Sequence, residues 1–138
     1  MRAITGSVLL SLCLLLPGYG ASAQNLGPKF KEMKDGIFTY TGKPQDSNCT
    51  IILTQEGVVL IDSGHNPTDS QLVLKTVKQL TPLPVRLLIN TEPHADHTTG
   101  HFVFSPPALI VAAAGASASM KAAFNPQRAA KMSEESPD

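Results

Sequence analysis

The residues whose types and spacing could carry chemistry lie in one short segment, residues 91–100. Within it, Glu92, His94, Asp96 and His97 place four potential metal ligands within six positions. Residues i and i+2 of extended backbone point to the same side, so Glu92 and His94 could reach one ion together. A turn after His94 would aim Asp96 and His97 at a neighbouring point. Carboxylate and imidazole groups are both zinc ligands, so the pattern predicts a zinc site, the alternative being a chance grouping in a polar loop.

The position of this segment in the chain also suits a binding site. Pro93 fixes its own φ and favours extended backbone at Glu92. The segment directly follows a predicted strand over residues 85–90, and ligands of α/β sheets bind beyond the carboxyl ends of strands. We therefore expect the four side chains to lie at one edge of a sheet.

The elements that must position this segment follow from hydrophobic periodicity. Thr68 and Gln71 fit a capping box, and apolar residues at 73, 77 and 80 predict an amphipathic helix that ends before Pro82. The helix separates two strands, which predicts a βαβ unit. The predicted strands cover residues 37–40, 49–54, 58–61, 85–90 and 108–112, and a further helix is predicted over residues 113–123.

Two motifs resemble those of a known family. Residues 92–97 (Glu-Pro-His-Ala-Asp-His) resemble the H-x-H-x-D-H signature of the metallo-β-lactamase superfamily, with Glu at the first His. Residues 60–64 (Leu-Ile-Asp-Ser-Gly) resemble that family's strand-ending D-[ST]-G motif. The resemblance covers about residues 36–125. It implies an α/β fold (α+β in looser usage), namely the N-terminal half of an αββα sandwich.

The resemblance also implies a role for each residue of the motifs. Glu92 and His94 would hold a first metal ion, and Asp96 and His97 a second. Asp96 would act catalytically by positioning the attacking water, and Asp62 would lie beneath the site and orient its loops. The implied cofactor is zinc, as one or two ions, and the implied activity is hydrolysis of a small-molecule substrate by a β-lactamase, thioesterase, lactonase or similar enzyme.

The sequence departs from the family in two ways. Glu92 adds negative charge, which should reduce the acidifying effect of the metal on bound water. The family needs further ligands later in the chain, whereas the last of the four histidines is His101 and the later acids are Glu134, Glu135 and Asp138. We therefore expect a truncated, inactive form of a zinc hydrolase that binds zinc weakly. The alternatives are a non-catalytic remnant or metal-binding module, and an unrelated exported α/β binding domain.

The N-terminal segment has the features of a secretory signal peptide. Arg2 precedes a short apolar run over residues 8–16, and residues 21–23 (Ala-Ser-Ala) form an A-x-A cleavage site. We expect a signal peptide over residues 1–23, a partial domain over residues 24–138 truncated at its C-terminus, and a periplasmic or secreted product. An uncleaved anchor or a buried helix is the alternative.

Composition limits the partners of the chain. Its 138 residues allow one domain, and 11 basic and 11 acidic residues give zero formal net charge. Without a basic stripe or Trp, nucleic-acid binding is unsupported, and we expect no membrane partner after signal cleavage. Signal cleavage would remove Cys13 and leave Cys49, which is expected to be a buried core thiol. Half a sandwich would expose one sheet face, through which we expect self-association.

Overall fold

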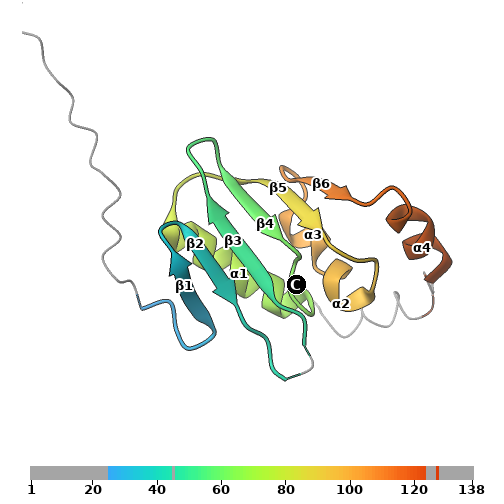
Figure 1. Cartoon of the computed structure of the whole chain (residues 1–138), viewed down its shortest axis with the longest axis horizontal. Coiled ribbons are helices and arrows are strands. Elements are labelled where there is room, and N and C mark those ends of the chain that lie inside the picture. Colours follow the sequence, from blue (N-terminus) through green and yellow to red (C-terminus); the bar gives the residue numbers. More distant parts are fainter. Residues whose placement is uncertain (1–24, 45, 124–126, 128–138) are drawn as a thin grey trace, which may run out of the picture.

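A six-stranded mixed sheet forms the body of the protein in the computed structural model, which describes residues 25–44, 46–123 and 127. The strands lie in the sheet in chain order, and β1 to β4 are antiparallel neighbours, whereas β5 and β6 are added in parallel (Figure 1). The predicted α/β class is thus confirmed. The strands are β1 (Phe30–Lys34), β2 (Ile37–Tyr40), β3 (Cys49–Leu53), β4 (Val58–Ile61), β5 (Val85–Asn90) and β6 (Leu109–Ala112).

The core lies between one face of this sheet and helix α1 (Pro67–Leu80). Alternate strand residues point toward the helix, and Ile51, Leu60 and Leu88 are completely buried. Val73 and Val77 are the buried residues of α1 that meet them. Burial of each such side chain contributes about 1.5–3 kcal/mol, so this layer fixes α1 against the sheet. Cys49 belongs to the same cluster, which confirms it as a core thiol.

The start of α1 differs from the sequence prediction. The N-cap is Asn66, whose side-chain oxygen accepts a hydrogen bond from the Asp69 backbone N–H at 3.0 Å. Thr68 lies inside the first turn, so the predicted capping box of Thr68 and Gln71 is wrong. The physical reason is Pro67, whose fixed φ and missing N–H suit the first helical position and leave the cap to the preceding residue.

The second face of the sheet is also apolar. One row of registered residues crosses the sheet as Ile37, Ile52, Val59, Leu87 and Leu109. The next row ends in Ile89 and Val111, of which 37% and 44% of the surface is exposed, while Leu109 is 66% exposed. The β5–β6 end of this face therefore presents apolar side chains to solvent.

Three elements were not predicted and three have shifted bounds, of which β3 ends at Leu53, one residue earlier than predicted. Strand β1 and the four-residue helices α2 (Ala95–Thr98) and α3 (His101–Phe104) are additional. Strand β6 begins one residue later than predicted, and helix α4 (Ala116–Ala123) begins three residues later, after Gly115. Within the described residues, no helix has the length and apolar character needed to cross a membrane. The predicted signal peptide, residues 1–23, lies outside the described residues.

Candidate metal centre

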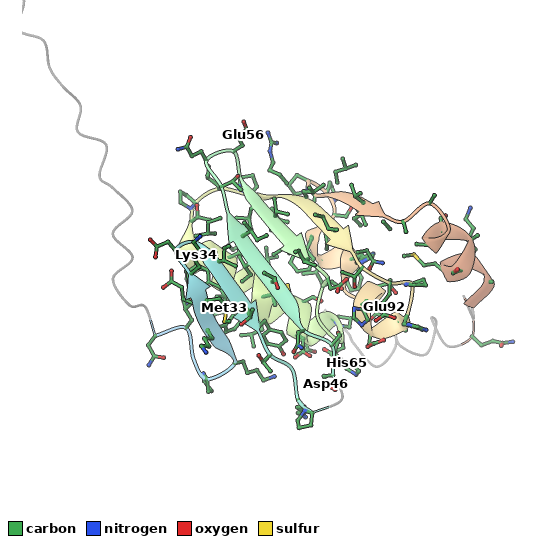
Figure 2. The ribbon with its side chains drawn as sticks, in the orientation of Figure 1. Met33, Lys34, Asp46, Glu56, His65 and Glu92 are labelled. Atoms are coloured by element: carbon green, nitrogen blue, oxygen red, sulfur yellow. The ribbon has the colours of Figure 1, made fainter. Side chains whose placement is uncertain are left out.

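The segment singled out by sequence lies at the carboxyl end of β5, as predicted. It leaves the strand at Asn90, runs extended to His94 and then forms α2, so the expected turn after His94 is one turn of helix. In Figure 2, Glu92, His65 and Asp46 lie toward one end of the sheet, whereas Glu56 marks the β3–β4 hairpin at the other end. The candidate site is thus confined to one edge of the molecule.

His97 is the centre of the cluster that the structure brings together. Its Nε2 lies 2.9 Å from Oε1 of Glu92 and 3.3 Å from Oδ2 of Asp96. The other carboxylate oxygen of Glu92, Oε2, contacts Nδ1 of His94 directly. Glu92 therefore links the two predicted ligand pairs, rather than serving the first pair alone. All four predicted ligand residues lie in one continuous group.

Burial differs sharply among these side chains. His97 is only 16% exposed, whereas His94 is 74% exposed and Glu92 is 42% exposed. The Nδ1 atom of His97 is buried, and it lies 3.0 Å from Oδ2 of Asp62 without the alignment of a hydrogen bond. A buried polar atom without an aligned partner is costly. The imidazole of His97 is thus the fixed member of the group, and His94 is the accessible one.

Asp62 contacts the first residue of the loop. It follows β4 directly and has a φ of 59°, a left-handed conformation that Asp adopts more readily than most residues. Its carboxylate accepts two hydrogen bonds from Thr91, from the backbone N–H at 2.8 Å and from Oγ1 at 2.7 Å. Asp62 therefore ties the end of β4 to the first residue after β5.

Asn90 is a contributor that sequence reasoning missed. Its side chain is 3% exposed; Nδ2 donates to the Glu92 carbonyl at 2.6 Å, and Oδ1 lies 2.9 Å from Nε2 of His101. Burial, partly offset by a hydrogen bond to the His97 backbone and by the charge of Asp62, lowers the pKa of His101 below its ordinary value. The Asn90 contact thus fits a neutral His101 that donates through Nε2.

His65 occupies the neighbouring loop and does not join the cluster. Its Nε2 lies 3.6 Å from Oδ1 of Asp46, and its carbonyl accepts a hydrogen bond from Thr99. These contacts connect the β2–β3 loop, the β4–α1 loop and the end of α2. His65 therefore helps to hold together the loops that surround the site.

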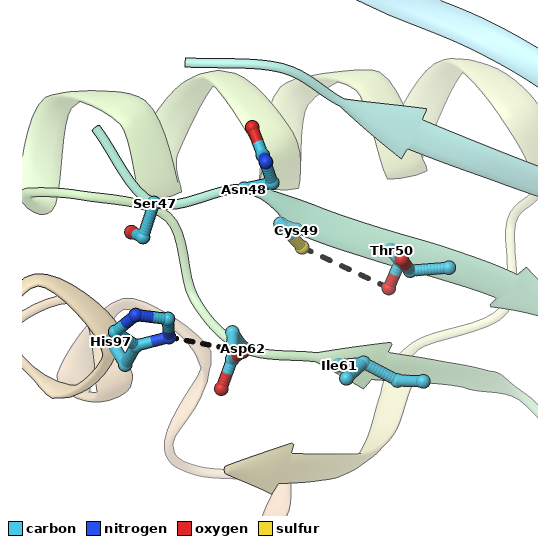
Figure 3. Close-up of a pocket in the computed structure, with 7 residues that line it drawn as sticks. All are labelled: Ser47, Asn48, Cys49, Thr50, Ile61, Asp62 and His97. Atoms are coloured by element: carbon cyan, nitrogen blue, oxygen red, sulfur yellow. Dashed lines mark hydrogen bonds and ion pairs between the residues drawn. The ribbon is translucent and has the colours of Figure 1, made fainter. Parts of the chain in front are cut away.

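A shallow pocket of about 270 Å³ opens beside His97 (Figure 3). Asp62 and His97 form one side of it, and the start of β3 forms the other. Cys49 also lines it, but burial, reinforced by the charge of Asp62, raises the pKa of its thiol far above the ordinary value. Since the thiolate is the reactive form, Cys49 is unsuited to be a nucleophile here. The complete lining is Ser47, Asn48, Cys49, Thr50, Ile61, Asp62 and His97.

The donor set fits zinc in chemistry but is small in number. Two ligand atoms at about 2.1 Å from a tetrahedral zinc lie roughly 3.4 Å apart, close to the 3.3 Å between Asp96 Oδ2 and His97 Nε2. The closer contact of Glu92 with His94 is that of a directly paired carboxylate and imidazole. Among the described residues, no group of three or more His, Cys, Asp or Glu side chains is arranged to hold a metal ion. Asp96 and His97 are thus the best-spaced pair.

The fold is shared with solved metallo-β-lactamases and with a solved alkylsulfatase. A metallo-β-lactamase from Pontibacter korlensis superposes with a TM-score of 0.62 and 21% identity over 68% of this chain and 47% of that one. A metallo-β-lactamase from Pseudomonas aeruginosa, in its mono-zinc form, gives 0.57 and 18% over 69% and 48%. An inverting sec-alkylsulfatase from a Pseudomonas species gives 0.58 and 22% over 67% and 16%. The chain thus spans less than half the length of each of these proteins.

A comparison with family models identifies the class of protein. The model of the metallo-β-lactamase superfamily matches residues 42–121, which is more than half of the 138 residues. The chain therefore belongs to the metallo-β-lactamase superfamily, as the two motifs predicted, and the unrelated α/β domain is no longer an alternative. A search of curated proteins gave no match. Because the identities are under 25%, the solved structures establish the fold of this chain but not its substrate.

Proposed function

We propose that this chain carries the metal-binding loop of a zinc-dependent hydrolase of the superfamily. The observation that supports it most directly is the convergence of Glu92, His94, Asp96 and His97 at the carboxyl end of β5. Asp62 lies beneath them and holds the first residue of the loop. A structural neighbour in its mono-zinc form supports zinc as the metal.

Each residue has a distinct task in this proposal. Asp96 and His97 would hold one zinc ion, and Glu92 with the exposed His94 would hold a second or serve as a weaker point of attachment. When bound, zinc lowers the pKa of water and polarises a substrate carbonyl. Asp96, 36% exposed at the rim, would accept a hydrogen bond from the attacking water and so orient it. The pocket beside His97 would receive part of the substrate.

The donor count limits what the chain can do alone. Catalytic zinc usually has three protein ligands and a water, whereas the described residues supply only two donors at each point, and of the two pairs only Asp96 and His97 are spaced for zinc. Catalysis depends on tight placement of the reacting groups, and incomplete coordination leaves the water poorly placed. We therefore propose weak zinc binding and little or no turnover by the 138-residue chain. The carboxylate of Glu92 would further reduce the acidifying effect of the metal.

The test is a zinc titration followed by a screen of ester, thioester, lactone, amide and sulfate substrates. His94→Ala and Asp96→Ala should each weaken zinc binding at least tenfold. Glu56→Gln removes a carboxylate at the opposite end of the sheet and serves as the matched control. Enzyme-like turnover that survives both loop substitutions would show that the site assignment is wrong.

A non-catalytic metal-binding module is the second candidate. The donor count favours it, because the described residues hold no group of three or more His, Cys, Asp or Glu side chains arranged to hold a metal ion, whereas catalytic zinc usually has three protein ligands. The two candidates differ in a measurable way. Zinc binding that depends on His94 and Asp96, without turnover of any substrate class by this chain or by a version extended toward the length of its solved structural neighbours, would favour the module.

A further inference from the structure

The main-chain carbonyls of the four candidate ligand residues share an unusual feature. Each accepts a hydrogen bond from a side-chain hydroxyl or amide. Ser63 Oγ donates to His97 at 2.8 Å, Asn90 Nδ2 to Glu92 at 2.6 Å, and Ser47 Oγ donates to Asp96 in a short contact. Thr98 Oγ1 donates to the carbonyl of His94 at 3.0 Å from within the loop itself. The whole segment is thus held through its backbone.

Three of these donors come from separate elements and are buried. Ser47 precedes β3 and is 6% exposed, Ser63 follows β4 and is completely buried, and Asn90 ends β5 at 3% exposure. Ser47 is 49 residues from its acceptor in the chain, and Ser63 is 34 residues away. Each of the three strands that meet at this edge thus contributes one donor to the same loop.

Two of the donors are themselves held by hydrogen bonds. Ser70 Oγ donates at 2.5 Å to the carbonyl of Ser63, which fixes the backbone from which the Ser63 hydroxyl extends. The Asn90 amide is fixed by His101. These partners orient the donors before any ligand binds, as the outer partners of metal ligands commonly do.

The physical consequence concerns the direction of the ligand side chains. A hydrogen bond to a carbonyl fixes the plane of that peptide and, with it, the direction of the adjacent Cα–Cβ bond. Packing cannot supply this for His94 or Glu92, because both are substantially exposed. Asp96 is also 36% exposed. Hydrogen bonds to the backbone are therefore the means by which an exposed loop can fix the directions of its side chains.

We propose that Ser47, Ser63 and Asn90 are positioning residues, which orient the metal-binding loop through the carbonyls of Asp96, His97 and Glu92. The assignment rests on the proposed function insofar as the loop binds metal. None of the three residues contacts the ion in this scheme. Each acts through a main-chain atom of a ligand residue.

The experiment compares Ser47→Ala, Ser63→Ala and Asn90→Leu in the full chain. Thr54→Ala is the control, because it removes a hydroxyl-to-carbonyl bond of 2.7 Å in the β3–β4 hairpin, far from the site. Cobalt is the probe, since zinc has no visible spectrum. The second readout is the set of ring-proton chemical shifts of His97 in the metal-free protein at one fixed pH. Melting temperatures are recorded for every variant.

Each of the three variants should bind cobalt about tenfold more weakly and give an altered cobalt spectrum. Each should also displace the His97 ring signals, whereas Thr54→Ala should lower the melting temperature and leave both readouts unchanged. Ser47→Thr, which keeps the hydroxyl, should restore the wild-type spectrum. The proposal is overturned if the three variants lose stability as Thr54→Ala does while cobalt affinity, spectrum and ring signals stay as in the wild type.

The same design separates this proposal from the proposed function. If the wild-type chain binds no cobalt, metal binding by the chain is refuted. The ring signals then decide the positioning role alone. Displaced signals in the three variants support it, and unchanged signals refute it.

Discussion

The carboxylate of Asp62 accepts both polar hydrogens that Thr91 offers, from the backbone N–H at 2.8 Å and from the hydroxyl at 2.7 Å. This pair joins the end of β4 to the start of the site loop. Because Asp62 is buried and has a φ of 59°, it combines a charge with a backbone conformation that few residues tolerate.

Replacement of Asp62 should separate these two contributions. Asp62→Asn keeps a side chain that tolerates the left-handed conformation but removes the charge, and we expect a loss of about 1–2 kcal/mol in the free energy of unfolding. Asp62→Ala should lose a further 1 kcal/mol or so through backbone strain. Thr91→Val, which removes only the hydroxyl bond, should cost about 1 kcal/mol. Urea unfolding of the three variants measures this, and equal stability of the Asn and Ala variants would contradict the strain.

Gly100 should not tolerate a side chain. A Cβ built there would lie 1.8 Å from Oγ of Ser70 and 2.8 Å from its Cβ. Because Ser70 is completely buried, Gly100→Ala should destabilise the fold by about 1–3 kcal/mol. Gly115→Ala is the matched control, since a Cβ there meets nothing within 4 Å. Thermal unfolding checks the pair, and adding Ser70→Gly to Gly100→Ala should recover part of the loss.

His101 should make the protein less stable in mild acid. Its pKa is lower in the folded protein than the ordinary value of 6.5, chiefly because it is buried. Below about pH 6.5 the unfolded chain therefore binds more protons at this position, and stability falls as the pH drops toward the folded pKa. His101→Gln removes this effect, and its stability should vary less steeply between pH 7 and 5, by at most about 1.4 kcal/mol per pH unit. Parallel profiles for the two proteins would rule this out.

The sequence predicted the sheet well where its pattern was strong. Strands β2, β4 and β5 match their predicted bounds because most of their residues are apolar, aromatic or β-branched. Strand β1 was missed because four of its five residues are exposed and three are charged, which leaves no alternation to detect. Helices α2 and α3 have four residues each, too few for a helical period to show.

The candidate site was likewise predictable only in part from the sequence. The spacing of Glu92, His94, Asp96 and His97 predicted that they lie together at one edge of the sheet. They do, because the four residues are close in the sequence. The contributions of Ser47 and Ser63 could not be predicted, because a hydroxyl that bonds to a carbonyl 49 or 34 residues away leaves no local pattern. The link from Glu92 to His97 depends on the turn of α2, which the sequence did not specify as helix.

The exposed side chains of β6 should drive self-association. Leu109 and Val111 extend the apolar second face to an edge strand, and such edges favour pairing between chains. We expect Leu109→Lys with Val111→Lys to lower the sedimentation coefficient of the chain at high concentration. Met33→Lys, at a 58% exposed position on the opposite edge, is the control. A wild-type monomer with a sharp, cooperative thermal transition would contradict this expectation.

Export should leave a chain that begins at Gln24. Arg2, the apolar run over residues 8–16 and the small residues before the cleavage point motivate this expectation. The intact mass of the protein recovered from the periplasm or medium of a bacterial host measures it. Ala21→Leu with Ala23→Leu should block processing. Recovery of the full-length chain from the cytosol would refute export.

The order of the strands has a consequence for how the site is assembled. Because every strand pairs with its neighbour in sequence, each pairing closes a single connection, and the entropy lost in closure grows only slowly with its length. During synthesis, each strand after β1 therefore meets a partner that has already been made. Asp62, at the end of β4, is synthesised before Thr91, so the loop that follows β5 closes onto a carboxylate that is already present.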